Sequence, residues 1–147
     1  MHLDNPFCPL CNQNVEETDL HLLSDCVFAQ NCWKSLIPNK KRGTSLYEET
    51  LFAIDQLPKA FAPENVILGC WTIWNDTNDK IFTGIQHTIQ SWRFHFKQDL
   101  KLLQHKIKKK HSREFNKWVH NNFQFFVFNV YKNMHWLTFL FYFLGSI

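Results

Sequence analysis

Residues 8–26 read CPLCNQNVEETDLHLLSDC and place two cysteines before a histidine and a third cysteine. The spacing is Cys8-x2-Cys11, then nine residues, then His21-x4-Cys26. A tight turn points both sulfurs of a C-x2-C pair the same way. A second pair about one helical turn apart supplies the other half of a tetrahedron. The pattern therefore predicts a Zn²⁺ site with Cys8, Cys11, His21 and Cys26 as its ligands.

A Cys3His set fills the four-coordinate shell of zinc and leaves no position for a reacting water, so the predicted site is structural. Thr18 is a suitable N-cap for a short helix that begins at Asp19 and carries His21. The surrounding segment is too small to bury a core of its own. Metal binding, worth about 10–16 kcal/mol in comparable modules, would supply its folding free energy.

Two alternative interpretations of these residues stay open. Cys8 and Cys11 would form a redox dithiol if a βαβ pattern surrounded them, but the sequence has none. Alternatively, His21 is an ordinary surface histidine and Cys26 a core thiol. Cys32 and Cys70 lie in helical apolar patterns and are expected to be buried free thiols. The N-terminus has neither a basic start nor an apolar run, so we expect an intracellular protein, nuclear or cytoplasmic, with reduced cysteines.

Further residues around this pattern point to a known family. They are Cys8-Pro-Leu-Cys11, Glu17-Thr18, His21-Leu22-Leu23, Cys26, Ala29 and Trp33. Together they resemble the reverse transcriptase zinc-binding domain (zf-RVT) of plant non-LTR retrotransposons. The resemblance implies the same four metal ligands, and it implies that Ala29 and Trp33 pack the following helix onto the zinc segment. It also implies a non-catalytic role beside a reverse transcriptase that handles template RNA or target DNA.

The similarity extends from about residue 6 to about residue 120. Trp71-Thr-Ile-Trp74, Asn78 and Ile81-Phe82 are similar to the tryptophan-rich helix that follows the zinc segment in that family. Two departures stand out. Nothing of the usual upstream portion precedes Cys8, which suggests a truncated copy, and Thr77 stands where a basic residue is common.

The charge distribution divides the chain into three parts. Residues 1–33 hold five acidic side chains and no Lys or Arg, whereas residues 93–117 hold nine basic side chains against two acidic ones. Residues 123–147 hold 10 of the 24 aromatic residues and a single lysine. We therefore expect a zinc-binding module over 1–36, a helical domain over 37–122 and an aromatic, apolar tail over 123–147. With 147 residues and 45% apolar composition, the chain is too short for a polymerase.

The middle of the chain has helical periodicity. Ser45 and Glu48 form a capping box, and Pro58 ends the helix that follows. Its apolar stripe is Tyr47, Leu51, Ile54 and Leu57. A second helix is expected from Pro63, with an inner face of Ile67, Trp71, Trp74, Asn78 and Ile81. A third is expected from Thr83-Gly84, with the stripe Ile85, Ile89, Trp92, Phe96, Leu100, Leu103 and Ile107. The expected fold class is mostly α, and these aromatic side chains are expected to form the core.

Basic residues beside the last stripe suggest a phosphate-binding face for RNA or DNA. They are Arg93, Lys97, Lys101, Lys106, Lys108, Lys109, Lys110 and Arg113. Binding through them would weaken steeply with salt and would tolerate any sequence. The alternative is a solvated helix face whose lysine stems cover apolar surface. The acidic zinc segment, with three thiolates around the ion, is a poor surface for phosphate.

The tail over 123–147 has three interpretations. It could be a hydrophobic C-terminal helix that packs on the core, a membrane anchor, or read-through past the original coding end. Asn129, Lys132, Asn133 and His135 interrupt its apolar run, so a spanning helix would have only 12 clean residues from Trp136. The chain has no paired-aspartate polymerase motif, phosphate loop or nucleophile elbow, so we expect neither an enzyme nor a small-molecule substrate. If the tail is a membrane anchor, the alternative function is that of a small tail-anchored membrane protein whose helices contact other proteins.

Overall fold

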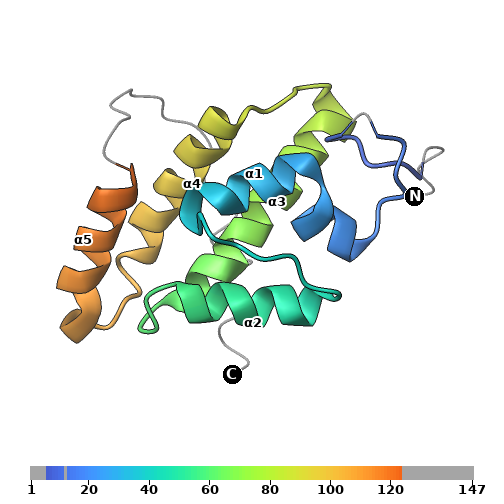
Figure 1. Ribbon diagram of the computed structural model, residues 1–147. Coiled ribbons are helices and arrows are strands. Elements are labelled where there is room, and N and C mark those ends of the chain that lie inside the picture. Colours follow the sequence, from blue (N-terminus) through green and yellow to red (C-terminus); the bar gives the residue numbers. More distant parts are fainter. Residues whose placement is uncertain (1–5, 12, 124–147) are drawn as a thin grey trace.

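The computed structural model describes residues 6–11 and 13–123, which are mostly helical (Figure 1). The predicted mostly α fold is confirmed for these residues. Their strand-like pairing is limited to one antiparallel bridge between Phe7 and Glu16. The predicted hydrophobic helix in the tail lies outside the described residues. The helical segments in chain order are η1 (His21–Asp25), α1 (Val27–Leu36), α2 (Leu46–Gln56), α3 (Ala62–Thr83), α4 (Ile89–Leu103), η2 (Lys109–His111) and α5 (Ser112–Phe123).

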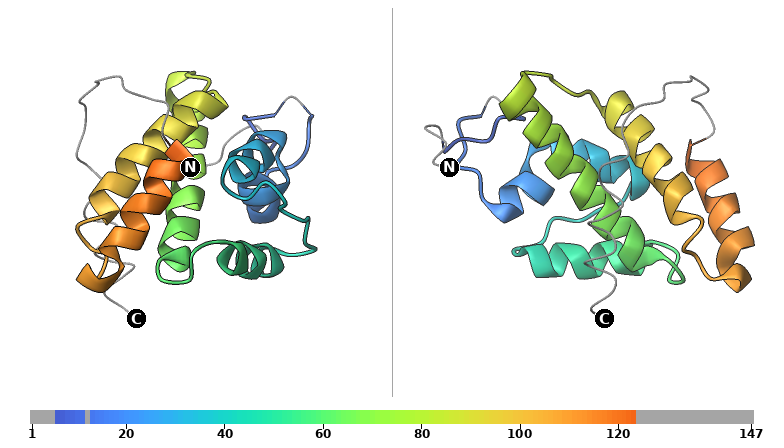
Figure 2. Two further views of the ribbon diagram at one scale, coloured as in Figure 1. Left: turned by 60° about the vertical axis from the view of Figure 1, so that its left-hand side comes forward. Right: turned by 180° about the vertical axis from the view of Figure 1, so that it is seen from behind.

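The long helix α3 is the centre of the arrangement. It contacts α1, α2, α4 and η1, while α5 packs on the opposite side of α4. Figure 2 shows α3 and α4 as a helical hairpin with α5 beside it, and the N-terminal segments on the other side of α3. None of the helices in the described ranges combines the length and apolarity needed to cross a membrane.

One hydrophobic core joins the N-terminal segment to the helical domain. Cys26 and Trp33 from the first part belong to the same buried cluster as Ile73, Trp92 and Phe115 from the second, and all five are at most 3% exposed. The expected boundary between residues 36 and 37 therefore falls inside a shared core. The segment that carries the four predicted ligands packs against α3 through η1.

Helix α2 begins and ends where the sequence predicts. The Ser45 hydroxyl accepts a hydrogen bond from the Glu48 amide at 3.2 Å, and the helix ends at Gln56, before Pro58. The second half of the expected capping box differs. The Glu48 carboxylate accepts from the amide of Thr44, at 2.8 Å, one residue before the N-cap.

The predicted inner face of α2 is only partly correct. Tyr47 and Leu51 are exposed, whereas Leu57 is buried. Glu49 occupies the buried face because Lys40, from the preceding loop, forms an ion pair with its carboxylate. Binary hydrophobic patterning misses such a position because a buried charge is tolerated only with a partner from elsewhere in the chain.

The predicted inner face of α3 is wrong. Trp74 is 44% exposed, and the partly exposed Trp71 lies beside it, with the two rings tilted at 33° and their centroids 5.1 Å apart. The buried face instead carries smaller and more polar side chains: Asn65, Val66, Gly69, Thr72, Ile73, Asp76 and Thr77. Small residues are needed there because α3 is crowded on several sides by other helices.

The third helix starts later than predicted. Residues 83 and 84 end α3, with Gly84 in the left-handed region at φ 72°. Helix α4 starts after Thr88, which forms a true capping box with Ser91. Ile85 is consequently exposed in the connecting loop. Of the rest of the stripe, Trp92, Phe96, Leu100 and Leu103 are buried as predicted, whereas Ile89 is only partly buried and Ile107 lies beyond the end of α4.

Candidate metal centre and basic surface

A short backbone pairing folds the first two predicted ligands into position. The Cys8 amide donates to the carbonyl of Val15 at 2.9 Å, and the Glu17 amide donates to the carbonyl of Pro6 at 2.9 Å. These two bonds close the turn that contains Cys11. The C-x2-C pair therefore lies in a small hairpin-like turn.

A π-helical turn positions the other two ligands. The Thr18 hydroxyl accepts from the His21 amide at 3.1 Å, so its predicted capping role is confirmed. The Cys26 amide donates to the His21 carbonyl at 2.7 Å and closes a turn of five residues. This wide turn brings the two side chains to the same side, and π-turns of this kind frequently occur at functional sites.

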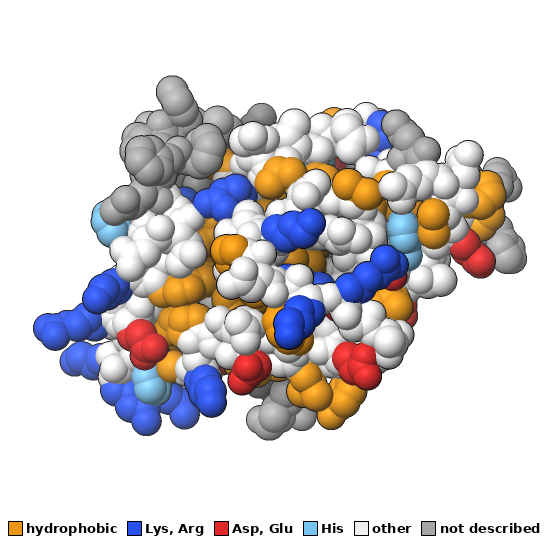
Figure 3. Space-filling model, in the orientation of Figure 1, with side chains coloured by type: hydrophobic (Ala, Val, Ile, Leu, Met, Phe, Trp, Pro, Cys, Tyr) orange, Lys and Arg blue, Asp and Glu red, His pale blue; other side chains and the backbone are white. Residues whose placement is uncertain are grey.

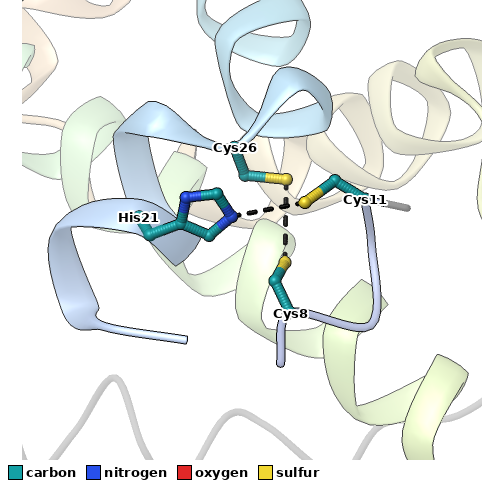
Figure 4. A group of neighbouring side chains, drawn as sticks. All are labelled: Cys8, Cys11, His21 and Cys26. Carbon is teal, nitrogen blue, oxygen red and sulfur yellow. Dashed lines mark hydrogen bonds between the residues drawn. The ribbon is translucent and has the colours of Figure 1, made fainter. Parts of the chain in front are cut away.

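The four predicted ligands converge in the structure (Figure 4). One ligand atom from each of Cys8, Cys11, His21 and Cys26 lies within 4.8 Å of all the others. Cys8 Sγ and Cys26 Sγ are 3.8 Å apart, and Cys11 Sγ is 3.3 Å from His21 Nε2. All of these residues are buried except Cys11, which is partly exposed.

These separations agree with a tetrahedral zinc shell. Zinc–sulfur bonds of about 2.3 Å imply sulfur–sulfur edges of about 3.8 Å, and a zinc–nitrogen bond of about 2.0 Å implies a sulfur–nitrogen edge of about 3.5 Å. The measured 3.8 Å and 3.3 Å lie close to both values. The four residues are thus close enough to hold one metal ion, and their donor set suits zinc.

The thiols of Cys8 and Cys26 share a hydrogen bond that shifts their pKa values in opposite directions. The hydrogen bond to Cys26 and burial raise the pKa of the Cys8 thiol, while the same hydrogen bond lowers the pKa of Cys26. One proton therefore links two sulfurs that both require deprotonation to bind a metal. A divalent cation between all four ligands would replace that proton and release it to solvent.

Helix α1 packs onto η1, the turn that carries His21, through Ala29 and Trp33. Ala29 is fully buried, and the indole of Trp33 donates to the carbonyl of Leu23 in η1 at 2.7 Å. The other edge of the Trp33 ring lies against Gly69 of α3, where a Cβ would approach it to 2.6 Å. Trp33 therefore connects the candidate metal centre to the central helix.

The two remaining cysteines lie outside the candidate metal centre. Cys32 is fully buried, as predicted, and burial raises the pKa of its thiol. Cys70 is only partly buried, which corrects the expectation, and burial of its sulfur raises its pKa to about 11. Neither belongs to a group of described side chains that could hold a metal.

Two of the predicted phosphate-binding residues are occupied within the fold. Arg93 donates to the carbonyl of Asn122 at 2.6 Å and lies over the ring of Phe123. Lys97 donates to the carbonyl of Phe123 at 2.6 Å. These cations satisfy carbonyls at the C-terminal end of α5, where positive charge is favourable.

The other six predicted cations lie farther along the chain, on exposed positions from the end of α4 to α5. Lys101 is near Gln98, with 3.4 Å between the two side chains. Figure 3 shows Lys and Arg side chains gathered at the η2 end of α5, with little acidic surface among them. We call this the basic end; its residues are Lys106, Lys108, Lys109, Lys110, Arg113 and Lys117.

The structure also brings together three titratable residues that the sequence did not single out. Asp76, His87 and His95 come from α3, the following loop and α4, and their ligand atoms lie within 4.8 Å of one another. Their spacing matches no short metal-binding motif. Only the packing of α3 against α4 places them side by side.

No protein-family model, curated protein or solved structure matches the chain.

Proposed function

We propose that this chain is a non-catalytic, zinc-stabilised helical module that binds RNA or DNA without sequence preference through its basic end. Its resemblance to the reverse transcriptase zinc-binding domain supports an origin in a retrotransposon polyprotein. The observation that carries the proposal is the concentration of exposed cations around η2. Six Lys and Arg residues stand against one carboxylate, Glu114, between residues 106 and 117.

The candidate metal centre and the basic end lie at opposite sides of the molecule (Figure 1). A Cys3His centre with three thiolates around Zn²⁺ carries a charge of −1, and the first 33 residues are acidic. Phosphate would be repelled from that side and attracted to the other. The metal therefore acts as a scaffold in this proposal, and the nucleic acid lies along η2 and α5.

The cations of the basic end suit phosphate contacts rather than base recognition. Lysine presents a compact charge on a flexible stem, whereas reading a base requires a rigid, bidentate side chain. Five of the six cations here are lysines. Binding should thus be similar for unrelated sequences and should depend steeply on salt.

The test measures binding of labelled duplex DNA to the full chain over a range of salt concentrations. The variant Lys109→Gln/Lys110→Gln removes two adjacent cations of η2, and Lys34→Gln/Lys41→Gln removes two exposed cations elsewhere. Each lost phosphate contact should reduce the slope of log K against log salt by about 0.9. We expect the η2 pair to lower affinity roughly tenfold and the slope by up to about 1.8.

The control variant Lys34→Gln/Lys41→Gln should change affinity much less, because it lowers the net charge equally but keeps all the cations of the basic end. Equal losses in the two pairs would show that η2 has no special role. Absence of binding even at low salt would contradict the proposed function as a whole.

A further inference from the structure

Asp76, His87 and His95 form a cluster of metal-ligating side chains separate from the four cysteine and histidine ligands. Asp76 Oδ1 lies 3.5 Å from Nδ1 of His95 and 3.7 Å from Nε2 of His87. The two imidazole rings are 5.2 Å apart and nearly perpendicular. A single carboxylate oxygen therefore faces one nitrogen of each ring.

These distances are within ion-pair range but longer than the about 2.7–3.2 Å of a typical hydrogen bond between nitrogen and oxygen. They agree better with the edge of a tetrahedron around an ion. Zinc bonds of about 2.0–2.1 Å to nitrogen and oxygen imply ligand–ligand edges of about 3.4 Å. Two of the three edges of the cluster lie close to this value, and the ligand atoms of the two histidines are within 4.8 Å of one another.

The carboxylate of Asp76 is the strongest sign that a ligand belongs here. Asp76 is 1% exposed, and its Oδ2 has no hydrogen-bond partner among the described residues. Within the same ranges, no lysine or arginine forms an ion pair with it, and its charged contacts are the two histidines. Burial of a carboxylate without full compensation is costly, so such groups are normally paired or coordinate a metal.

The charge around the cluster also favours a cation. Asp79, one helical turn after Asp76, places its Oδ2 2.8 Å from Nε2 of His87. Asp99 of α4 places its carboxyl 3.4 Å from the hydroxyl of Thr72, but burial raises its pKa to about 7, so it carries little negative charge below that pH. The carboxylates of Asp76 and Asp79 thus face the two imidazoles.

We propose that Asp76, His87 and His95 form a second binding site, for a divalent transition-metal ion of the zinc type, with Asp79 as the fourth ligand. Imidazole ligands select zinc and its neighbours over Mg²⁺ and Ca²⁺, which take oxygen ligands. Binding requires Nε2 of His87 to present a lone pair. In the metal-bound form the ring proton of His87 is on Nδ1, and the Asp79 carboxylate, which lies 2.8 Å from Nε2, exchanges its contact with that nitrogen for one with the metal.

The second site would cross-link the last turns of α3, the loop after Gly84 and the second turn of α4. It contains no sulfur, so it is spectroscopically distinct from the cysteine-rich centre. The inference does not depend on the proposed nucleic-acid function, because it concerns neither the basic end nor the residues of η2.

The test is a metal count on the full chain. Elemental analysis after zinc loading should give two ions per chain, while the thiolate-to-cobalt absorption of the Co²⁺ form should saturate at one equivalent. The double variant His87→Ala/His95→Ala should bind one ion and keep the full thiolate band, which also shows that it is folded. His105→Ala, which removes an exposed histidine, should still bind two.

A second measurement needs no variant. In protein labelled with ¹⁵N-histidine, the second zinc equivalent should shift Nδ1 of His95 and Nε2 of His87 and leave His105 unchanged. One zinc per chain in the unmodified protein would overturn the proposal. So would a second ion that leaves the resonances of both histidines in place, or one that the double variant retains.

Discussion

Trp33 and Gly69 show how one residue pair holds the metal segment against the helical domain. Trp33 is 3% exposed, and its indole nitrogen is fixed by the carbonyl of Leu23. Its ring edge then occupies the space that a side chain at position 69 would need. The tryptophan can be inferred from the sequence, but its glycine partner, 36 residues away, depends on how α1 crosses α3.

Gly69→Ala should destabilise the fold even though alanine is the better helix former. The new Cβ would lie 2.6 Å from Cη2 of a tryptophan that is held in place. Overpacking costs about 1–3 kcal/mol, which exceeds the gain of about 1 kcal/mol in helix propensity. We expect urea denaturation to show a loss of up to about 2 kcal/mol.

The control for this substitution is the same change in a Trp33→Phe background, where the outer ring atoms are absent. There Gly69→Ala should be neutral or stabilising. Equal losses in both backgrounds would disprove the contact with the ring.

Asp99 should make stability fall as pH rises. Burial raises the pKa of its carboxyl to about 7, above its ordinary value of 3.8. Between these two values the folded chain keeps a proton that the unfolded chain has released, so the free energy of unfolding decreases with pH. Asp99→Asn should remove this decrease. As the pH rises from 4 to 7, the free energy of unfolding of the variant should therefore increase relative to that of the wild type by at most about 4 kcal/mol.

The measurement compares the two proteins by urea denaturation at pH 5.5 and pH 7.5, with the zinc concentration held constant. The exposed Asp55 of α2 provides the matched control Asp55→Asn. A difference between wild type and Asp99→Asn that does not change with pH would rule out this role for Asp99.

At the scale of elements, local signals predicted helix ends better than helix faces. Ser45 and Pro58 delimit α2 correctly because caps and stops act through the nearest backbone groups. The sequence predicts a helix start at Thr83-Gly84, whereas these residues end α3. Threonine and glycine occur at both ends of helices, so the pair alone does not tell a start from an end. The inner face of α3 was wrong because large aromatic residues mark a buried face only when neighbouring helices leave room for them.

Thr88→Ala tests the observed start of α4. The Thr88 hydroxyl accepts from the Ser91 amide at 3.1 Å, and the Ser91 hydroxyl accepts from the Thr88 amide at 2.8 Å. Loss of this cap should cost about 1 kcal/mol in chemical denaturation. Thr83→Ala should cost less than about 0.5 kcal/mol, because that exposed hydroxyl only donates to the carbonyl of Asp79. A larger loss of stability in Thr83→Ala than in Thr88→Ala would indicate that the helix begins at Thr83-Gly84, as the sequence predicted.

At the scale of the whole molecule, the two candidate metal sites differ in how far the sequence could predict them. The Cys3His ligands lie within 19 residues and follow a spacing set by local turns, so the pattern alone identified all four. Asp76, His87 and His95 are brought together by the tertiary packing of α3 against α4. No periodicity or motif encodes that packing.

The separation of charge is likewise a property of the whole fold. The sequence predicted one phosphate-binding face of eight cations, but Arg93 and Lys97 donate hydrogen bonds to carbonyls at the end of α5. The cations around η2 remain exposed, away from the acidic metal segment. Because both parts share one core, loss of the metal should weaken the helices that carry the basic end.

The central claim is that Cys8, Cys11, His21 and Cys26 hold one structural metal ion. Titration of the reduced full chain with Co²⁺ tests it most directly, because three thiolate ligands give an intense charge-transfer absorption. We predict a thiolate band that saturates at one equivalent, disappears on addition of zinc and is retained in Cys70→Ser. It should be lost or strongly reduced in Cys11→Ser, together with part of the thermal stability. A missing band, or an unchanged band in Cys11→Ser, would contradict the account.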